Sequence, residues 1–470
     1  MSRVAFLCHP TIGHLNTLLS MALRMRAEGH QPRFILPSGS LPRFRWMPEV
    51  LKTVGEVAAT VERQGLPVER LRMPLGALVP ALRLASTMGY EELRLALKIF
   101  TAGMTPQARH VVRLLERQPV DVVVTDFAFF PAALAAERLG LPWVSVYHSG
   151  LPFRGPGVPP MGSGLPLPMP PGPELQRAEA EEAQVLAWLH RRGEVARRAL
   201  GLGPGPEDLL CRPLSPWLNL VTSHEAIEAP RTGLGPSCFF IGPCFSTRRG
   251  GDTGDFPFEK LRPEAFKVYV SMGTVFNTRP EVFRTLLRAL DLPGVQVVAS
   301  AGGSYERLAS GPLPANVLLF RRVPQVELLP RVDLVIGHGG NNSTNETLAA
   351  GRPLLVVPVG GEQQDNGRRV EYLGAGLSLP LLGLNEEGVR QAVTRLRQEP
   401  GFRARAEALR QSLEDTDGPS TACALIARLA RQRAPLHLPA GMPRTVTRQG
   451  LAPLLEALGE PASGPRARSS

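Results

Sequence analysis

One stretch of the chain, residues 335–366, constrains the fold more than any other. It reads VIGHGGNNSTNETLAAGRPLLVVPVGGEQQDN. An apolar strand at residues 334–336 leads into a turn at 338–340, and Asn342 and Ser343 predict the start of a helix. A helix that follows a glycine turn presents unpaired N–H groups and the positive end of its dipole. The pattern therefore predicts an anion-binding turn of phosphate size.

A second polar turn follows the next apolar strand. Residues 354–357 predict this strand, and the polar run 358–366 comes directly after it. The carboxyl ends of parallel strands lie on one edge of a sheet, so the two turns are expected to open side by side. Alone, the His-Gly-Gly turn is equally compatible with an ordinary strand-to-helix connection. Two adjacent polar turns favour one shared ligand.

Alternating strands and helices along the whole chain indicate the α/β class. At 470 residues the chain exceeds what one core usually supports, so we predict two Rossmann-like units. The first opens with a strand at 4–8, a helix at about 16–28 and a strand at 33–36. Its further strands are predicted at 121–124, 142–146, 218–222 and 238–241. The strands of the second unit are predicted at 268–271, 295–299, 317–320, 334–336 and 354–357.

Composition shifts give the predicted boundaries. An N-terminal domain spans 1–245, a linker that starts with a polar, glycine-rich run spans 246–265, and a C-terminal domain spans 266–418. A last helix is expected at 419–432. The tail 433–470 is predicted to be partly disordered.

The net charge of +11 does not by itself indicate nucleic acid. Only four of the 53 basic residues are lysine, and no basic stripe is interleaved with aromatic residues, so we predict no nucleic-acid partner. No apolar run approaches the roughly 20 residues of a transmembrane helix, although the basic charge leaves weak association with a membrane surface open. Five scattered cysteines favour a reduced, cytoplasmic setting.

Residues 323–366 resemble the donor-binding signature of the family 1 glycosyltransferases. This family includes the macrolide glycosyltransferases and the plant and animal UDP-glycosyltransferases. The resemblance rests on Pro324-Gln325, His338-Gly339-Gly340, Asn342-Ser343, Glu346 and Glu362-Gln363. It implies a GT-B fold, in which two Rossmann-like domains face each other across a cleft. The donor is then expected in the C-terminal half, the acceptor mostly in the N-terminal half, and the last helix crossing back to the N-terminal domain.

The same resemblance implies a catalytic pair. Gly13-His14-Leu15-Asn16 resembles the N-terminal Gly-His motif whose histidine is the general base. Asp126 ends the strand after Asp121 and is the expected partner that orients His14, whereas Asp121 lies at the opposite end. A histidine can remove the proton of an acceptor hydroxyl near neutral pH, and a carboxylate behind it fixes the tautomer. The implied reaction is a single displacement with inversion at the anomeric carbon.

The remaining candidates are implied contacts of a nucleotide sugar. They are Thr274, His338, Gly340, Asn342 and Ser343 for the pyrophosphate, Glu346 for the ribose, Glu362 and Gln363 for the sugar, and Gln325 and Arg322 for the base. Arg322 stands where many relatives carry an aromatic residue that stacks on uracil. A guanidinium also stacks, so a UDP-sugar is the default donor and a TDP-sugar stays open.

No metal or further cofactor is expected. Asp415-Thr-Asp417 is formally a DxD pattern, but it follows an arginine-rich helical pattern and precedes Gly418-Pro419, which favours a turn between two helices. P-loop, zinc-ligand and HExxH patterns are absent from the sequence.

The implied activity is transfer of a hexose to a hydroxyl of a lipophilic small molecule of the polyketide, terpenoid or carotenoid type. A Pro- and Gly-rich loop at 150–172 is a candidate wall of the acceptor pocket. The apolar stretch 71–104 is a second candidate, although most of it is read more simply as core. Two alternatives remain: a nucleotide-sugar epimerase of the same fold, and a non-catalytic partner of another glycosyltransferase. The intact His14 and Asp126 disfavour both.

Overall fold

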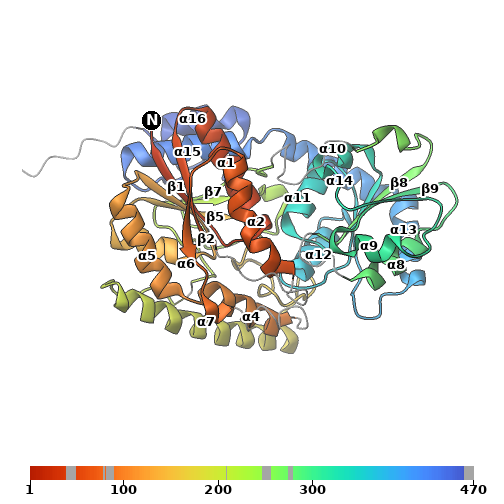
Figure 1. Ribbon diagram of the computed structural model, residues 1–470, viewed down its shortest axis with the longest axis horizontal. Coiled ribbons are helices and arrows are strands. Elements are labelled where there is room, and N and C mark those ends of the chain that lie inside the picture. Colours follow the sequence, from red (N-terminus) through yellow and green to blue (C-terminus); the bar gives the residue numbers. More distant parts are fainter. Residues whose placement is uncertain are drawn as a thin grey trace, which may run out of the picture.

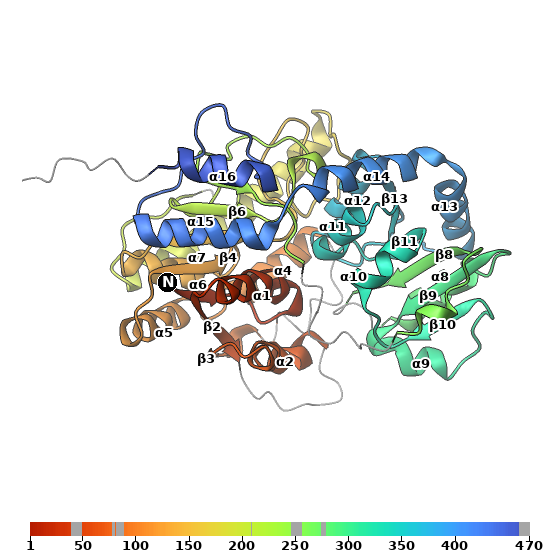
Figure 2. The same ribbon diagram turned by 90° about the horizontal axis from the view of Figure 1, so that it is seen from above.

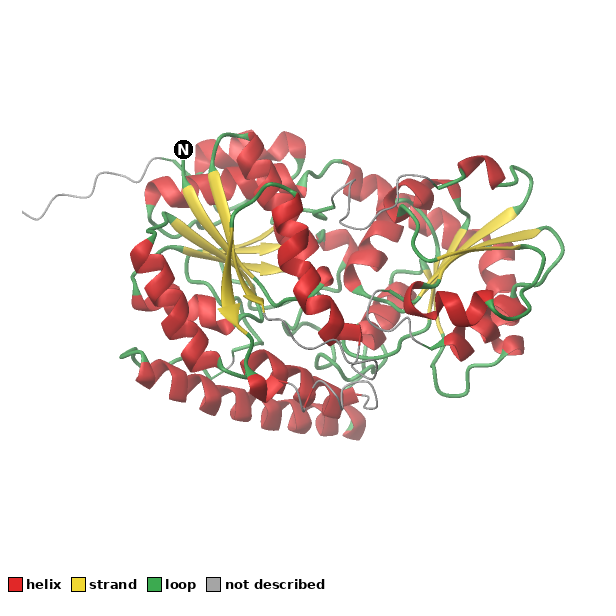
Figure 3. Ribbon diagram, viewed as in Figure 1, coloured by secondary structure: helices red, strands yellow, loops and turns green. Residues whose placement is uncertain are grey.

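Two parallel β-sheets, each flanked by helices, organise the chain (Figures 1 and 3). The computed structural model describes residues 1–38, 49–77, 80, 89–207, 209–245, 256–273 and 279–459. The predicted α/β class with two Rossmann-like units is confirmed.

The N-terminal sheet has seven strands in the order β3-β2-β1-β4-β5-β6-β7. Its central strands are buried on both faces, which explains why β4, VVVTD, is a continuous apolar run up to Thr125. All neighbouring strands pair in parallel. The strands are β1 (Arg3–Leu7), β2 (Gln31–Ser38), β3 (Val68–Arg72), β4 (Val122–Asp126), β5 (Trp143–Tyr147), β6 (Leu218–Val221) and β7 (Cys238–Phe240).

The C-terminal sheet has six strands in the order β10-β9-β8-β11-β12-β13. These pairs are parallel as well. The strands are β8 (Phe266–Ser271), β9 (Val295–Ser300), β10 (Val317–Phe320), β11 (Leu334–Gly337), β12 (Leu354–Val356) and β13 (Gly376–Ser378).

Helices connect the strands. The first, α1 (Ile12–Ala27), buries Leu15, Leu18 and Met25 against the sheet and ends where Gly29 adopts a φ of 82°. No helix in the described part of the chain combines the length and apolar character that a bilayer crossing requires. The further helices of the N-terminal unit are α2 (Glu49–Arg63), α4 (Gly89–Thr101), α5 (Met104–Arg117), α6 (Phe130–Arg138) and α7 (Pro173–Ala199). Those of the C-terminal unit are α8 (Pro280–Ala289), α9 (Tyr305–Ala309), α10 (Gln325–Leu328), α11 (Asn341–Ala349), α12 (Gln363–Tyr372), α13 (Glu386–Gln398) and α14 (Pro400–Glu414).

The last two helices, α15 (Gly418–Gln432) and α16 (Arg448–Ala457), return to the N-terminal unit (Figure 2). Leu425 and Ile426 of α15 share one core cluster with Leu15 and Leu18 of α1. Beyond residue 433, where the sequence predicted only a tail, Leu436, Val446 and Leu454 are buried in that same core. Residues 246–255 of the predicted linker and the tip 460–470 lie outside the described residues.

The chain passes between the two units twice, and the second crossing packs against the residues that precede the first. Gly242 and Pro243 precede the first crossing, and Thr416 to Gly418 form the second. A Cβ atom on Gly418 would lie 2.6 Å from the carbonyl oxygen of Pro243. Gly242 has a φ of 79° and faces the side chain of Thr416 just as closely. Only glycine fits this contact at both positions.

Candidate active site

The candidate site lies where the strand order of each sheet reverses. In the N-terminal sheet the reversal falls between β1 and β4, and in the C-terminal sheet between β8 and β11. Open parallel sheets bind ligands at the carboxyl ends of such strands. His14 follows β1, Asp126 ends β4 and His338 follows β11. The predicted turn at His14 is wrong in detail, because α1 begins at Ile12 and His14 sits in its first turn.

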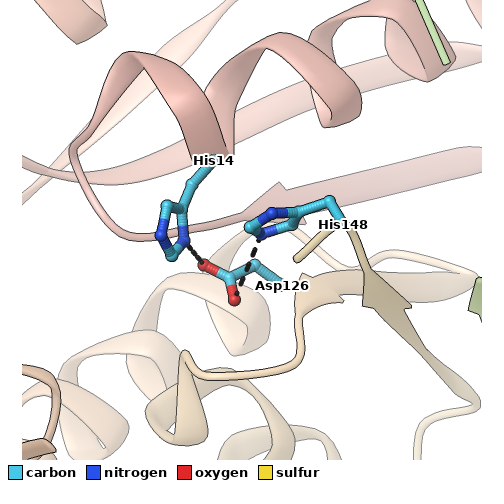
Figure 4. Close-up of side chains that lie close together, drawn as sticks. All are labelled: His14, Asp126 and His148. Atoms are coloured by element: carbon cyan, nitrogen blue, oxygen red, sulfur yellow. Dashed lines mark hydrogen bonds and ion pairs between the residues drawn. The ribbon is translucent and has the colours of Figure 1, made fainter. Parts of the chain in front are cut away.

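His14 and Asp126 form the expected pair. Nδ1 of His14 lies 2.6 Å from Oδ2 of Asp126 (Figure 4). The Asp126 side chain is fully buried, whereas that of His14 is 21% exposed. Asp126 also accepts the backbone N–H groups of Ala128 at 2.8 Å and of His9 at 3.3 Å. The carboxylate is therefore held in place, and Nε2 of His14 is left for a substrate.

The electrostatics of the pair suit a general base. Burial raises the pKa of Asp126, but His14, which is hydrogen-bonded to it, and the nearby His148 outweigh burial and hold that pKa well below its usual range. Burial lowers the pKa of His14, yet Asp126 and, to a smaller extent, Glu362 outweigh this effect and raise it. Asp126 thus stays ionised and favours the proton on His14.

Two other histidines border the pair. Burial lowers the pKa of His9 to about 4, and its Nε2 lies 3.0 Å from the carbonyl oxygen of Ala128, which agrees with the sequence's preference for His14. Sequence reasoning missed His148, whose Nε2 lies 3.6 Å from Oδ1 of Asp126. A signal was present: His148 follows the strand next to β4 and so stands at the same sheet edge.

Residues 338–343, which lead into α11 and form its start, are the candidate anion-binding turn that we call the cradle. Gly340 is the N-cap of α11, so the helix starts at Asn341, one residue before the first predicted capping residue. As a glycine, Gly340 has no side chain with which to cap this end. Gly339 has a φ of 82°, and a Cβ there would meet Val356 and the Gln363 carbonyl. The uncapped N–H groups can bind an anion, as the glycine turn predicts.

His338 of the cradle stands between two glycines. A Cβ on either Gly273 or Gly340 would lie 2.5 Å from its ring. Burial lowers the pKa of His338 to about 4, so the ring is neutral at pH 7. Within the described part of the chain, its buried Nδ1 has no hydrogen-bond partner. A neutral imidazole in this position can donate one hydrogen bond to a phosphate oxygen without adding charge.

A buried chain of two hydrogen bonds holds Glu346 in place. The hydroxyl of Tyr269 donates to Oε1 of Gln325 at 3.0 Å, and Nε2 of Gln325 donates to Oε2 of Glu346 at 2.7 Å. Glu346 is 3% exposed, so it is not a solvated helical charge. Gln325, predicted to border the base, thus also holds the predicted ribose ligand. The neighbouring Arg322 is exposed.

The second polar turn leads into α12. Oε1 of Gln363 accepts the N–H groups of Val359 at 2.9 Å and Gly360 at 3.2 Å. Glu362 is the N-cap of α12, and its charge reaches His14 across the domain boundary. Thr274, the remaining predicted donor contact, lies outside the described residues.

Hydrogen bonds join the two domains at the site. Nδ2 of Asn342 donates to the carbonyl oxygen of Gly13 at 2.9 Å, next to His14. Asp365 accepts the N–H groups of Gly162 at 2.6 Å and Gly164 at 3.0 Å. The Pro- and Gly-rich loop is therefore attached to the C-terminal unit, and the start of α11 lies next to His14.

A buried charge pair also crosses this boundary. Arg369 of α12 binds Glu228, which follows β6, and both side chains are at most 4% exposed. The same guanidinium donates to Oδ1 of Asn341 at 2.8 Å and of Asn345 at 3.1 Å. Arg369 of α12 therefore also helps to hold the start of α11 in place.

Two groups in the described part of the chain bring three metal-type ligands together. They are His14, Asp126 and His148, and Glu28, His30 and Cys423, each with ligand atoms within 4.8 Å of one another. The first is organised by the hydrogen bond between Nδ1 and Oδ2, and the second by Cys423, which donates to Glu28 at 3.1 Å. Asp417 caps α15 by accepting the N–H of Ser420 at 3.1 Å, so the DxD pattern is a helix-to-helix turn as predicted.

A cavity of about 660 Å³ opens at the other edge of the N-terminal sheet. Trp143 and Ser215, which stand at the amino ends of β5 and β6, line it together with His190 of α7. The catalytic pair is at the carboxyl ends of the strands. This cavity is therefore separate from the candidate site.

Comparisons with known proteins identify the family of the chain. Residues 290–426 match the family model described as "Erythromycin biosynthesis protein CIII-like, C-terminal domain". The chain is 31% identical to 4'-demethylrebeccamycin synthase from Lentzea aerocolonigenes, over 91% of this chain and 99% of that protein. It is 25% identical to zeaxanthin glucosyltransferase from Pseudescherichia vulneris, over 91% and 97% respectively.

The fold agrees as well. The crystal structure of the kitacinnamycin glycotransferase is similar with a TM-score of 0.69 at 22% identity, and the match covers 91% of this chain and 99% of that one. The predicted GT-B fold is thus confirmed. The chain belongs to the family 1 glycosyltransferases and is a glycosyltransferase.

Proposed function

We propose that this glycosyltransferase moves a hexose from a UDP- or TDP-sugar to a hydroxyl of a lipophilic natural product, with inversion of the anomeric carbon. Nε2 of His14 takes the proton of the acceptor hydroxyl. The acceptor oxygen then bonds to the anomeric carbon as the bond to the diphosphate oxygen breaks, and the electron pair leaves with the nucleoside diphosphate. General-base action of this kind is worth about 10²- to 10⁴-fold in rate.

The donor is assigned to the C-terminal cradle. The uncapped start of α11 and the neutral His338 are suited to the charge that grows on the leaving diphosphate. Glu346, held by Gln325, is placed to accept ribose hydroxyls. Glu362, whose charge acts on His14, is placed to bind the sugar between cradle and base.

The acceptor is assigned to the N-terminal side, where the apolar ring of Phe100 lies beside His14. Phe100 of α4 meets His14 edge-on at 5.8 Å between ring centroids and stacks on His9 at 4.2 Å. An apolar wall beside a base favours a lipophilic acceptor. The relative named zeaxanthin glucosyltransferase supports both this acceptor class and glucose as the sugar. Residues 78, 79 and 81–88 of the apolar stretch lie outside the described residues.

One observation supports the proposal most strongly: the hydrogen-bonded pair of His14 and Asp126 lies against the start of α11. The bond from Asn342 to Gly13 brings the start of α11 to the residue next to the base. A nucleophile activated at His14 then has an anomeric carbon within reach. Proximity of this kind is what a two-substrate transfer requires.

The test is turnover of UDP-glucose and TDP-glucose with a panel of polyketide, terpenoid and carotenoid alcohols, followed by mass spectrometry. The proton coupling of the anomeric hydrogen in the product reports inversion. His14→Ala is expected to abolish most transfer, whereas His110→Ala, a histidine on α5 away from the pair, is expected to retain it. Full activity in His14→Ala, or a product of retained configuration, would refute the mechanism.

A further inference from the structure

A second imidazole flanks the carboxylate that orients His14. His148 follows β5, and its side chain is only 4% exposed. Its Nε2 lies 3.6 Å from Oδ1 of Asp126, while His14 holds Oδ2 at 2.6 Å (Figure 4). The two rings lie 4.5 Å apart, centroid to centroid, and are tilted by 66°. One buried carboxylate thus has a histidine beside each oxygen.

Oδ1 has room for this second partner. It accepts one N–H group, that of Ala128 at 2.8 Å, and a carboxylate oxygen can accept two. In the described part of the chain, Nε2 of His148 has no hydrogen-bond partner. A buried nitrogen without a partner is costly, and 3.6 Å is only just beyond hydrogen-bond range. A movement of a few tenths of an ångström would complete the bond.

The main chain of His148 is held by the donor domain. Its carbonyl oxygen accepts a hydrogen bond of 2.8 Å from Nδ2 of Asn341, the first residue of α11. Asn341 in turn accepts from Arg369, which is paired with the buried Glu228. The position of His148 therefore depends on the donor helix being docked against the N-terminal domain.

Building on the proposed function, we propose that His148 is a positioning residue that binds Oδ1 of Asp126 and thereby ties the orientation of His14 to the docked donor helix. His148 acts through Asp126 and touches neither substrate. An N–H group on Oδ1 withdraws charge from the carboxylate. Loss of that group leaves more charge on Oδ2, so protonated His14 is favoured.

The test compares the kcat of two variants of His148. One order of the two rates is expected if His148 binds Asp126, and the opposite order if His148 only fills space. His148→Phe keeps the ring volume and removes the nitrogen. A hydrogen bond to a charged group is worth about 1.5–3 kcal/mol, so kcat is expected to fall about 10- to 100-fold. The acid limb of the kcat profile is expected to move to higher pH, with the KM for the nucleotide sugar unchanged. His148→Gln restores an N–H donor and is expected to recover most of the rate. If His148 only fills space, Phe will match the wild type and Gln will be worse, which overturns the proposal.

Asn341→Leu tests the link to the donor helix without changing His148. It removes the bond to the carbonyl oxygen, and we expect the acid limb to move in the same direction as in His148→Phe. An acid limb that stays at the wild-type pH in Asn341→Leu would refute the link. Should His148→Phe fail to fold, as judged by circular dichroism, His148→Gln and Asn341→Leu decide the question.

Two controls separate this inference from the function it rests on. Full activity of His14→Ala would show that His14 is not the base and would refute the proposed mechanism. An inactive His14→Ala beside a wild-type pH profile in His148→Phe would refute only the role of His148. His110→Gln, on α5, is expected to leave both rate and pH profile unchanged.

Discussion

Replacing Asp126 with asparagine isolates the charge that orients His14. The substitution keeps the size of the side chain and an oxygen acceptor but removes the negative charge. Nδ1 of His14 and Oδ2 of Asp126 are 2.6 Å apart, and the carboxylate is fully buried. When His14 takes the acceptor proton, a unit positive charge appears next to that carboxylate. The variant loses this attraction only after proton transfer begins.

The expected size of the effect follows from the geometry. Two unit charges about 4 Å apart attract by about 4 kcal/mol at an effective dielectric constant of about 20. The charge centres of the imidazolium and the carboxylate are separated by about that distance. Each 1.4 kcal/mol, approximately, is a factor of ten in rate, so kcat is expected to fall about 10³-fold. This lies within the range of about 10²- to 10⁴-fold known for general bases.

The pH profile gives a second, independent signature. In the wild type, Asp126 raises the pKa of His14 although burial lowers it. In Asp126→Asn, burial still lowers the pKa of His14, but the negative charge that raised this pKa is gone. The pKa of His14 therefore falls, and the acid limb of kcat moves to lower pH. The assay is initial rates of product formation across pH at saturating donor and acceptor. The matched control is Asp121→Asn, whose pair with Arg3 at 2.9 Å is exposed to solvent, so this substitution is expected to change the rate little. An Asp126→Asn enzyme with an unmoved acid limb, or with a rate within tenfold of Asp121→Asn, would refute this reasoning.

Three further outcomes are expected. Phe100→Ala should raise the KM for a lipophilic acceptor by about 10- to 100-fold, the equivalent of about 1.5–3 kcal/mol of apolar burial, and leave the KM for the donor unchanged in steady-state kinetics. Arg369→Met leaves Glu228 buried without its main partner and should cost about 3–5 kcal/mol, seen as a lower melting temperature, whereas Arg390→Met at an exposed pair should cost less than about 1 kcal/mol. Burial raises the pKa of Asp365 to about 6, so the stability linked to its protonation is present below its unfolded pKa and is lost as pH rises through about 6. The wild-type melting temperature should therefore drop more than that of Asp365→Asn between about pH 4 and pH 7, and parallel curves would contradict this.

The strands that carry the site were predictable because they are buried on both faces. Such strands form continuous apolar runs, so β4, β8 and β11 were placed to within two residues. The edge strand β3, VERLR, is half polar, and β13 is three residues long, so neither gave a signal. The helix α7 is rich in charged residues on most of its surface and was missed as well.

The site was predictable only in part for a related reason. His14, Asp126 and the cradle follow strands whose ends the sequence defines. The second partner of Asp126 comes from a different strand, and the contacts of Asn341 and Asp365 join residues about 200 positions apart. No local pattern encodes contacts of that kind, since they depend on how the two domains dock.

The two connections between the units meet at Gly242 and Gly418. In domain closure, a few loop or element-terminal residues absorb the change in backbone angles. Any separation of the two units at the site would break the hydrogen bonds that Asn341, Asn342 and Asp365 make between them. A methyl group at Gly418 would meet the Pro243 carbonyl at 2.6 Å. A side chain at Gly418 would therefore push apart the connections between the units that carry His14 and the start of α11.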